Sequence, residues 1–434
     1  MAERRDSSGH RLKPAVSVAI LGAGARGQTF AGLVAERADR AHVVAVAEPR
    51  PAARAAMAAR YGLDGGSTFA SWQDFVAQPR MCDAVVVTTM DRDHAGPAIA
   101  CLERGYHLLL EKPMATTLEE CRAIADAARR SQGIASVCHS LRYHRGFARV
   151  KELVEDGRIG KILSVDQLEQ VGYWHYAHSY VRGNWGNEGR ATFMLLAKSC
   201  HDIDYISFLV GRACSEVASF GALSHLRREN APVGSTDRCT DGCAVESSCI
   251  FSAPRLYDGG PLESWLRDPE HGGAVPKGRA ARVALLRQSP YGRCVWRADN
   301  DVVDHQVVLM NFEGGVTATF TMAGLTDKLA RRVRVHGTEG ELEFEESAQP
   351  DGDRIVLRRF GGAIEELGVP AESGTHGGAD RRVVERWLEA INAGDPSLVL
   401  TSVAESLRTH TIVFAAEAAR LRKSVEKLAD WQLV

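Results

Sequence analysis

A glycine-rich turn near the start of the chain constrains its fold more than any other feature. Residues 15–21 (AVSVAIL) form a short apolar run with β-branched side chains, which is typical of a buried parallel strand. The segment Gly22-Ala23-Gly24-Ala25-Arg26-Gly27 follows at once and leads into a helical pattern. Gly22 permits a tight turn, Gly24 lets the backbone approach a pyrophosphate, and Gly27 allows close packing of helix on strand. This spacing between a strand and a helix predicts a dinucleotide-binding turn, with Ala25 and Arg26 as further contacts.

Strand and helix patterns alternate through the first third of the chain. Strands are predicted at 42–47, 84–89, 107–110 and 134–138, and helices at about 28–36, 52–60, 96–104 and 118–130. Alternation of units of this length predicts a parallel sheet with helices on both faces and right-handed crossovers.

The pattern changes after about residue 140. A helix at 146–155 and a strand at 162–170 are followed by alternating apolar and polar segments, which suit antiparallel strands, at 302–312, 315–322 and 332–335. The segment 311–315 (NFEGG) predicts a hairpin turn, and 380–392 and 402–421 are helical.

The predicted fold class is α/β, with two domains. Residues 15–138 form an N-terminal Rossmann domain with a parallel sheet, and residues 139–434 form a C-terminal α+β domain with an open, mostly antiparallel sheet. Residues 1–14 are predicted to be a flexible tail, and 225–290, rich in Gly, Pro, Arg and Cys, to be an insertion.

Composition excludes several classes of partner. The net charge of −2 and 25% charged residues suit a globular protein and give no basic surface for nucleic acid or an anionic membrane. No apolar run approaches the roughly 20 residues that span a bilayer, and no secretion signal is visible. Ten cysteines without such a signal favour reduced thiols and a cytoplasmic location. Cys101, Cys121 and Cys138 are predicted to be small core residues.

Residues at the ends of the second and third strands bear on the choice of nucleotide. Glu48 ends the second strand, where a carboxylate accepts hydrogen bonds from the adenosine ribose and repels the 2′-phosphate of NADP. The sequence therefore favours NAD, while Arg26 and Arg50 keep NADP open as an alternative. Candidate cofactor contacts after the third strand, with capping of the strand as an equal alternative, are Thr88, Thr89 and His94.

Glu111-Lys112-Pro113 follows the predicted strand at 107–110. A lysine at this end of a parallel strand lies at the mouth of the cofactor crevice. Burial beside a nicotinamide would depress its pKa, so Lys112 is a candidate acid–base group for hydride transfer. Pro113 fixes the local backbone and permits a cis peptide bond. An exposed lysine in a turn is the alternative.

Together, the glycine turn, Glu48 and the E-K-P triplet resemble the Gfo/Idh/MocA oxidoreductase family. The resemblance continues through 139–143 (HSLRY), 157–160 (GRIG), 201–204 (HDID) and 336–340 (HGTEG), and covers most of the chain outside the tail and the insertion. It implies an NAD(P)-dependent oxidoreductase that acts on a CH–OH group of a sugar, inositol or sugar acid. It also implies catalytic roles for Lys112 and for His201, which faces the substrate from a helix. Candidate substrate contacts within HSLRY are Arg142 and Tyr143.

The chain departs from the family pattern beside His201. Many members carry an aspartate where this chain has Ala197, and Lys198 follows it. Lys198 can share a helical face with His201, so it is a candidate for substrate binding or proton transfer. A solvated lysine is an equal alternative.

The segment 172–185 (GYWHYAHSYVRGNW) is rich in aromatic and histidine side chains. Aromatic faces with polar tips suit a sugar ring, although packing accounts for some of these residues. The candidate substrate contacts here are Tyr176, His178, Tyr180, Arg182 and Trp185. Arg182 together with Lys198 would favour an acidic substrate such as a uronic acid.

Cysteines in the predicted insertion suggest a structural metal. Cys239, Cys243 and Cys249 have the spacing C-x3-C-x5-C, and Cys294 is a possible fourth ligand. Four thiolates are able to hold a structural zinc ion in a segment with little core. Free thiols are an equal alternative, and an iron–sulfur cluster is less favoured.

The leading function is therefore NAD(P)-dependent hydride transfer to or from a small sugar-like substrate, in a homo-oligomer. The alternative is an NAD-dependent glycoside hydrolase, which oxidises a sugar transiently, eliminates the leaving group and reduces the product again. A non-catalytic NAD sensor is disfavoured, because a binding module has no need of Lys112.

Overall fold

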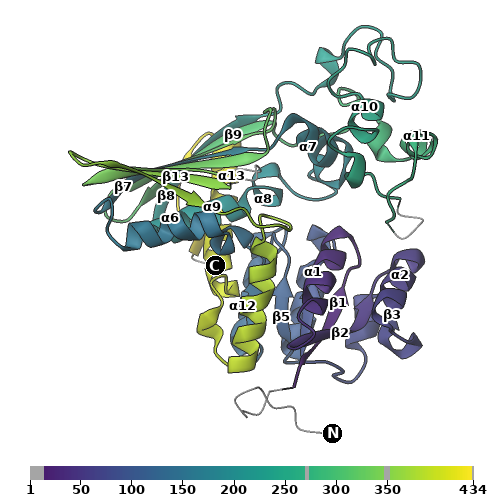
Figure 1. Ribbon diagram of the computed structural model, residues 1–434, viewed down its shortest axis with the longest axis horizontal. Coiled ribbons are helices and arrows are strands. Elements are labelled where there is room, and N and C mark those ends of the chain that lie inside the picture. The colour runs from purple at the N-terminus through teal and green to yellow at the C-terminus, as the bar shows by residue number, and fades with distance from the viewer. Residues whose placement is uncertain (1–13, 269–272, 347–351, 433–434) are drawn as a thin grey trace. The chain divides into compact units, whose positions relative to one another are not determined.

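The chain forms two compact units. The computed structural model describes residues 14–268, 273–346 and 352–432 (Figure 1). The N-terminal unit holds the described residues up to Cys138, together with residues 380–407, and the remaining described residues belong almost entirely to the C-terminal unit. The first stretch of the N-terminal unit ends at Cys138, and residues 380–407, predicted from the sequence to belong to the second domain, are also part of this unit. Of the predicted tail, only Pro14 lies inside the described residues.

The N-terminal unit contains a six-stranded parallel sheet in the order β3-β2-β1-β4-β5-β6. Its strands are β1 (Val16–Leu21), β2 (Ala41–Ala47), β3 (Thr68–Phe69), β4 (Ala84–Val87), β5 (His107–Leu110) and β6 (Ala135–Val137). The order runs outward from β1 on one side and from β4 on the other. Open α/β sheets bind ligands beyond the carboxyl ends of the strands at this reversal. The predicted Rossmann fold is confirmed.

Helices connect these strands. They are α1 (Ala25–Ala35), α2 (Pro51–Tyr61), α3 (Trp72–Val76), α4 (Ala95–Glu103) and α5 (Leu118–Arg130). Helix α1 starts at Ala25, earlier than predicted, because Gly24 is already its N-cap. Helix α12 (Ala379–Ala393) pairs with α1 through Arg381 and Glu36, 2.9 Å apart. The residues after it reach β6, where the Val137 amide donates to the Thr401 carbonyl at 2.9 Å. These contacts explain why 380–407 belong to this unit.

The C-terminal unit contains a nine-stranded sheet in the order β14-β13-β12-β11-β7-β10-β9-β8-β15. Its strands are β7 (Ile162–Gln170), β8 (Cys214–Ala222), β9 (His305–Phe312), β10 (Val316–Ala323), β11 (Ala330–Gly337), β12 (Gly340–Glu345), β13 (Asp353–Arg359), β14 (Ile364–Val369) and β15 (Val425–Lys427). Only β7 and β10 pair in parallel, so the predicted open, mostly antiparallel sheet is confirmed. The predicted hairpin between β9 and β10 is also present, with Phe312 opposite Val316.

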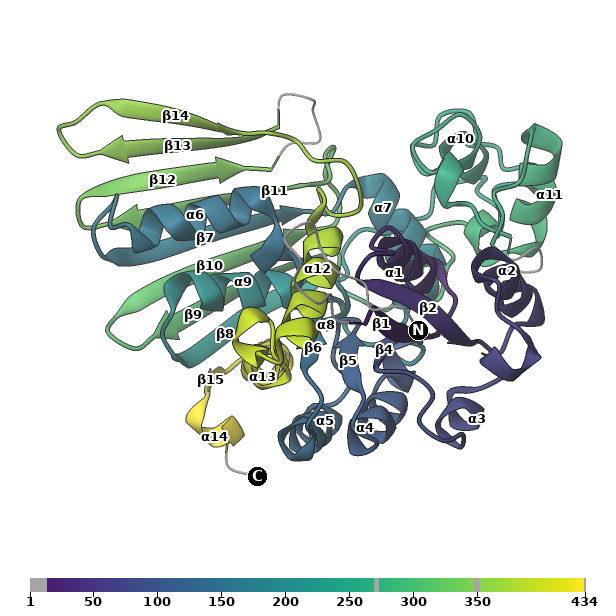
Figure 2. The same ribbon diagram turned by 60° about the horizontal axis from the view of Figure 1, so that its bottom comes forward.

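One face of this sheet carries the core of the unit. Helices α6 (Arg145–Glu155) and α9 (Cys200–Val210) lie along it (Figure 2). Alternate strand residues such as Val165, Phe320 and Val335 are fully buried against them. Shorter helices are α7 (Tyr173–Ala177), α8 (Met194–Ala197) and α14 (Ala429–Gln432), and α13 (Val403–Arg422) is the longest described helix. No helix in the described part of the chain is long and apolar enough to cross a membrane.

The predicted insertion consists mainly of turns. It contains α10 (Ala253–Tyr257), α11 (Arg279–Gln288) and short 3₁₀ segments. A small apolar cluster holds its second half together, formed by Ala253, Leu256, Tyr257, Leu262, Leu266 and Leu286. Residues 227–250 have no strand or α-helix, and none of their side chains is fully buried.

Candidate functional site

The glycine turn has the geometry that its sequence predicted. A Cβ on Gly27 would lie 1.9 Å from the Gly22 carbonyl oxygen, and one on Gly22, whose φ is +99°, 2.5 Å from the Thr88 carbonyl oxygen. These two glycines are therefore required for the backbone to close. Gly24 differs, because a Cβ there would meet only the Arg50 side chain, at 3.9 Å.

Helix α1 begins at this turn with an open N-terminus. Gly24, its N-cap, offers no side chain to the first amides, and the first turn holds no acidic residue. Gly24 is only partly buried and Ala25 is exposed. An 11-residue helix with uncapped amides and space above Gly24 fits a bound diphosphate. The structure therefore fits the pyrophosphate of a dinucleotide.

Glu48, the residue predicted to bind the adenosine ribose, contacts the glycine turn. Its buried carboxylate follows β2 and accepts from the Ala23 amide in the glycine turn at 2.7 Å. Arg50 donates to the same carboxylate from Nε at 2.6 Å and from NH2 at 3.0 Å. Burial alone would raise the pKa of Glu48, but the hydrogen bonds from Arg50 and Ala23 lower it, so the group is an anion. Arg50 is thus held by Glu48.

The loop that carries Lys112 is held on both sides. The buried Glu111 carboxylate accepts from Arg26 Nε and from the Lys112 amide. Beyond the cis bond between Lys112 and Pro113, the Pro113 carbonyl lies 2.7 Å from Nδ1 of the buried His94. Lys112 itself is half-buried, which differs from a freely exposed turn lysine.

Four of the predicted cofactor contacts have hydrogen-bond or ion-pair partners within the protein. Arg26 also pairs with Asp380 of α12 at 2.7 Å. Burial would lower the pKa of Arg26, but Glu111 and Asp380 raise it above the ordinary arginine value. Thr88 donates to the Gly22 carbonyl at 2.8 Å, and Thr89 to the Asp93 carbonyl at 2.9 Å. Arg26, Thr88, Thr89 and His94 thus help to position the turn and the lysine loop, and their contact with a cofactor stays a prediction.

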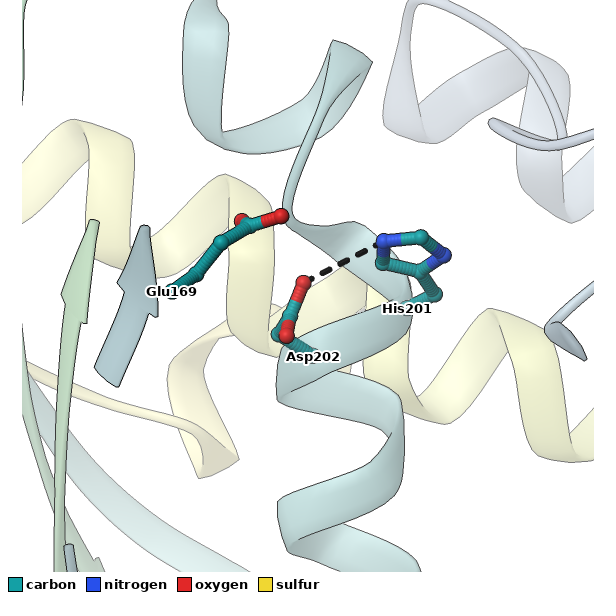
Figure 3. A group of neighbouring side chains, drawn as sticks. All are labelled: Glu169, His201 and Asp202. Carbon is teal, nitrogen blue, oxygen red and sulfur yellow. Dashed lines mark ion pairs between the residues drawn. The ribbon is translucent and has the colours of Figure 1, made fainter. Parts of the chain in front are cut away.

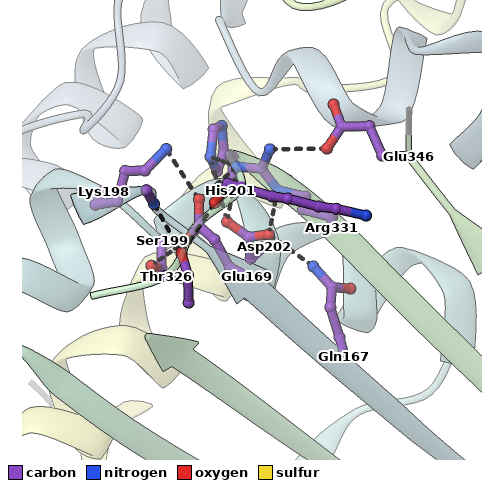
Figure 4. A network of polar contacts seen from close by, with 11 residues as sticks. Gln167, Glu169, Lys198, Ser199, His201, Asp202, Thr326, Arg331 and Glu346 are labelled. Carbon is purple, nitrogen blue, oxygen red and sulfur yellow. Dashed lines mark hydrogen bonds and ion pairs between the residues drawn. The ribbon is translucent and has the colours of Figure 1, made fainter. Parts of the chain in front are cut away.

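In the C-terminal unit, His201 belongs to a buried charged cluster. The cluster combines Glu169 of β7, Arg331 of β11 and the start of α9 (Figure 4). Glu169 and Arg331 are direct cross-strand partners, and their side chains meet at 2.7 Å. Arg331 also donates to Asp202 at 2.7 Å, and His201 Nε2 lies 2.9 Å from its NH2. The same Nε2 lies 3.2 Å from Asp202 Oδ2, so both Arg331 and Asp202 contact the His201 ring.

Glu169, His201 and Asp202 form the only group of three potential metal ligands within 4.8 Å of one another in the described residues (Figure 3). The guanidinium of Arg331 contacts all three. It supplies the positive charge that a metal ion would bring and fills the place between the ligand atoms. Burial would lower the pKa of Arg331, but Asp202 and Glu169 raise it well above the ordinary value. The cluster is therefore an ion-pair network.

Lys198 is a member of the same network. Its ammonium lies 2.9 Å from Glu169, and its side chain is 10% exposed. The alternative of a solvated lysine is thereby excluded. Glu169 also accepts from the Ser199 hydroxyl at 2.7 Å, and Asp202 from Gln167 at 2.7 Å. Sequence reasoning missed these partners, since the pattern of β7 shows only that Gln167 and Glu169 share its inner face with Val165.

The aromatic segment 172–185 packs within the C-terminal unit. The Tyr176 hydroxyl donates to the carbonyls of Val302 and Val303, and its side chain is fully buried. His178 stacks on Tyr291 with ring centroids 4.5 Å apart, and its Nδ1 lies 2.6 Å from the Tyr257 hydroxyl. Tyr180 is buried, and Trp185 packs on the main core.

The two arginines predicted to contact the substrate form hydrogen bonds with other groups of the protein. Arg182 is fully buried and donates to the Phe251 carbonyl at 2.7 Å. Arg142 forms a bidentate pair with Asp204, at 2.7 Å for each bond, and the neighbouring Tyr143 is buried. Tyr176, Arg142 and Arg182 are therefore held by groups of the protein itself, and their contact with a substrate stays a prediction. Because Glu169 pairs with Lys198, these contacts give little support to an acidic substrate.

Comparisons with known proteins agree with this architecture. The Gfo/Idh/MocA oxidoreductase-family model for an NAD-binding Rossmann fold matches residues 16–139, and the family's C-terminal alpha/beta domain matches residues 151–426. The putative oxidoreductase YteT of Bacillus subtilis is 24% identical over 315 residues, covering 70% of this chain and 71% of the relative. Levoglucosan dehydrogenase of Pseudarthrobacter phenanthrenivorans is 34% identical over 306 residues, covering 70% of this chain and 64% of the relative.

Solved structures show the same fold. Levoglucosan dehydrogenase in complex with NADH and L-sorbose superposes with a TM-score of 0.69 at 20% identity, covering 96% of this chain and 99% of the other. An aldose–aldose oxidoreductase from Caulobacter crescentus, complexed with glycerol, gives 0.66 at 17% identity, covering 95% and 100%.

A Rossmann unit with an open helix N-terminus, joined to a second unit with a mixed sheet, defines a class of dinucleotide-dependent oxidoreductases. The chain belongs to the Gfo/Idh/MocA oxidoreductase family, because the two family models together match nearly all of it. It is an NAD(P)-dependent oxidoreductase.

Proposed function

We propose that the protein transfers a hydride between NAD and a hydroxyl-bearing carbon of a neutral sugar or inositol. The observation that carries this proposal is the fixed lysine loop beside the glycine turn. Both follow strands of the same parallel sheet, Gly22 after β1 and Lys112 shortly after β5, with only β4 between them. Two strand spacings amount to about 10 Å, a distance that a bound dinucleotide spans easily.

Residues of the N-terminal unit would hold the cofactor. The amides of the α1 N-terminus bind the diphosphate, and Glu48 accepts from the ribose hydroxyls. The anionic state of Glu48 supports a preference for NAD, because the 2′-phosphate of NADP would meet a negative charge. When bound, the nicotinamide ring supplies the hydride acceptor or donor.

Lys112 is the proposed acid–base group. Oxidation of an alcohol removes a hydride from carbon and a proton from oxygen, and the Lys112 amine takes that proton. In the reverse direction its ammonium returns it. Arg26 and His94 contribute by fixing Glu111 and Pro113, the residues on either side of Lys112. A lysine held in this way loses little freedom on substrate binding.

We assign His201 and Lys198 to substrate binding, on the family resemblance and on their shared network. Asp202 and Arg331 hold the His201 ring, while Glu169 holds the Lys198 ammonium. Carboxylates outnumber cations in this network, with Glu169, Asp202 and Glu346 against Lys198 and Arg331, which suits a neutral polyol better than an acidic substrate. The names of several relatives agree with that class, including levoglucosan dehydrogenase and scyllo-inositol 2-dehydrogenase. Tyr180, Trp185, His178 and Tyr143 stay as weaker candidates, because all four lie in packed surroundings.

The outward face of the C-terminal sheet supports assembly into a homo-oligomer. Phe220 of β8 is 62% exposed and Leu309 of β9 is 43% exposed. Apolar side chains on an open sheet face are typical of a self-association surface.

The test is a screen of sugars, inositols and sugar acids with NAD⁺, in which NADH formation and release of sugar from glycosides are followed in parallel. On the best substrate, Lys112→Met should lower kcat by about 10²- to 10⁴-fold and leave NADH affinity nearly unchanged. Lys112→Arg, which keeps the charge but cannot give up its proton, should be equally slow. A near wild-type rate in Lys112→Met would refute the role of Lys112. Glycoside release without net NADH would favour the glycoside hydrolase instead.

A further inference from the structure

Four cysteines of the C-terminal unit line one cavity. Cys239, Cys243 and Cys249 belong to the insertion, and Cys294 follows it. None of the ten cysteines in the chain forms a disulfide; Cys239, Cys243 and Cys249 are partly exposed, whereas the other seven, Cys294 among them, are buried. Four thiols that line one cavity, three of them partly exposed, point to a function for the group.

Backbone hydrogen bonds bring these cysteines together. Arg238 and Arg293 form an isolated antiparallel bridge. The Cys239 amide donates to the Gly292 carbonyl at 2.9 Å, and the Cys294 amide donates to the Asp237 carbonyl at 2.9 Å. Residues on either side of such a bridge point to the same face, so Cys239 and Cys294 share one face of it. Cys243 and Cys249 lie in a run of turns closed by the bond from the Cys249 amide to the Val245 carbonyl, 2.9 Å.

A buried cation lies beside this cavity. Arg182 lines it with a fully buried side chain. Its Nε donates to the Arg293 carbonyl at 2.7 Å, and its NH2 donates to the Phe251 carbonyl at 2.7 Å and contacts Cys239 Sγ at 3.7 Å. Its NH1 has no hydrogen-bond partner within the described part of the chain. No carboxylate of the described residues forms an ion pair with Arg182, although Glu246 lines the same cavity and accepts a hydrogen bond from the Ser252 hydroxyl. A buried charge without a paired anion is costly.

We propose that Cys239, Cys243, Cys249 and Cys294 bind one zinc ion as thiolates, with Arg182 as the counter-charge. Zinc is the ion of choice because it favours four sulfur ligands and needs no redox partner. Four thiolates around Zn²⁺ carry a net charge of about −2, and the guanidinium neutralises part of it. The contact between Arg182 and Cys239 is of the kind that supports metal-bound sulfur.

The site is structural, because four thiolates leave no open coordination position. Residues 227–250 have no fully buried side chain and no strand or α-helix, so they cannot form a core of their own. In the described structure no three of the cysteine sulfurs lie within 4.8 Å of one another, whereas sulfurs around zinc are about 3.8 Å apart. Zinc binding would therefore bring the turns closer together, and the ion would stabilise this segment in place of a hydrophobic core.

The first test is metal analysis of the full-length protein, purified in reducing buffer without added zinc. We expect about one zinc per chain. The double variant Cys243→Ser, Cys249→Ser should lose it, and the control Cys82→Ser should keep it. Replacement by Co²⁺ should give the intense absorption of a tetrahedral cobalt thiolate. This spectrum is measured on the wild-type protein, so the test remains valid even if the double variant does not fold.

A second measurement separates this site from the proposed function. Removal of zinc by a chelator should make residues 227–250 sensitive to protease while NADH affinity stays within about twofold, since no step of the proposed chemistry uses the ion. Four results would overturn the proposal: metal-free folded protein that takes up no Co²⁺, zinc retained by the double variant, a disulfide among the four cysteines, and an iron–sulfur chromophore.

Discussion

Two arginines of the C-terminal unit are both buried, yet their surroundings differ. Arg331 pairs with Glu169 and Asp202, each at 2.7 Å. Arg182 has two carbonyls and one sulfur as partners. The first cluster pairs Arg331 and Lys198 with the carboxylates of Glu169, Asp202 and Glu346, whereas Arg182 forms no ion pair with a carboxylate of the described residues. Ion pairing therefore separates a self-contained network from the cavity proposed to bind an ion, although both contain groups that ligate metals.

The largest effect is expected from Arg331→Met. The substitution leaves Glu169 and Asp202, both fully buried, without their shared cation, and should lower the free energy of unfolding by about 3–5 kcal/mol. Urea denaturation measures this loss. The control is Arg334→Met on the same strand, because Arg334 is 49% exposed and pairs with Glu343 on the solvent side. Its cost should stay below about 1 kcal/mol. Equal losses in the two variants would contradict the assigned role of Arg331.

A smaller effect is expected from Arg182→Met. Loss of its bonds to two carbonyls should lower the free energy of unfolding by about 2 kcal/mol in zinc-loaded protein. In protein treated with a chelator the loss should be smaller, because the same change removes an uncompensated charge. Comparing urea denaturation with and without chelator measures the difference. A loss that is the same in both states would show that Arg182 does not serve as a counter-charge.

A third effect, about as large as that of Arg182→Met, concerns pH. Burial, with a further contribution from Arg182, lowers the pKa of His178 to about 3. Unfolded chains bind a proton at this histidine below about pH 6.5, whereas the folded protein stays neutral, so stability falls as the pH falls through that range. At pH 5 the expected cost is about 2 kcal/mol relative to pH 7. His178→Phe, which keeps the aromatic stacking on Tyr291, should flatten the pH dependence of unfolding by that amount. An unchanged pH profile would mean that His178 is protonated in the folded state.

Features set by neighbouring residues were predictable from the sequence. The glycine turn, the cis bond before Pro113 and most strands depend on local backbone geometry and on apolar patterning, which a sequence displays directly. The order of the parallel strands then follows from the family of folds that such a pattern allows.

Charge partners were not predictable in the same way. Arg26 was interpreted as a cofactor contact, yet one of its partners, Asp380, lies 354 residues further along the chain. The sequence gives no prediction for Arg331, because none of its neighbours along the chain indicates that it lies at the centre of a cluster formed by β7, α9 and β11. Arg182 was predicted to bind the substrate because its aromatic neighbours in the sequence suggested a binding surface. Only the folded structure shows that the insertion covers it. A burial pattern shows which face is inside but not which charges meet there.

Binding of NADH to wild-type protein and to Gly24→Val tests the central claim most directly. A side chain at position 24 meets only the tip of Arg50 at 3.9 Å, so the variant should fold normally while filling the space assigned to the diphosphate. Fluorescence titration should show NADH binding to the wild type and an affinity at least tenfold lower, about 1.4 kcal/mol or more, in the variant. Equal affinity in the two proteins, or no affinity of the wild type for either NADH or NADPH, would contradict the assignment of this turn as the cofactor site.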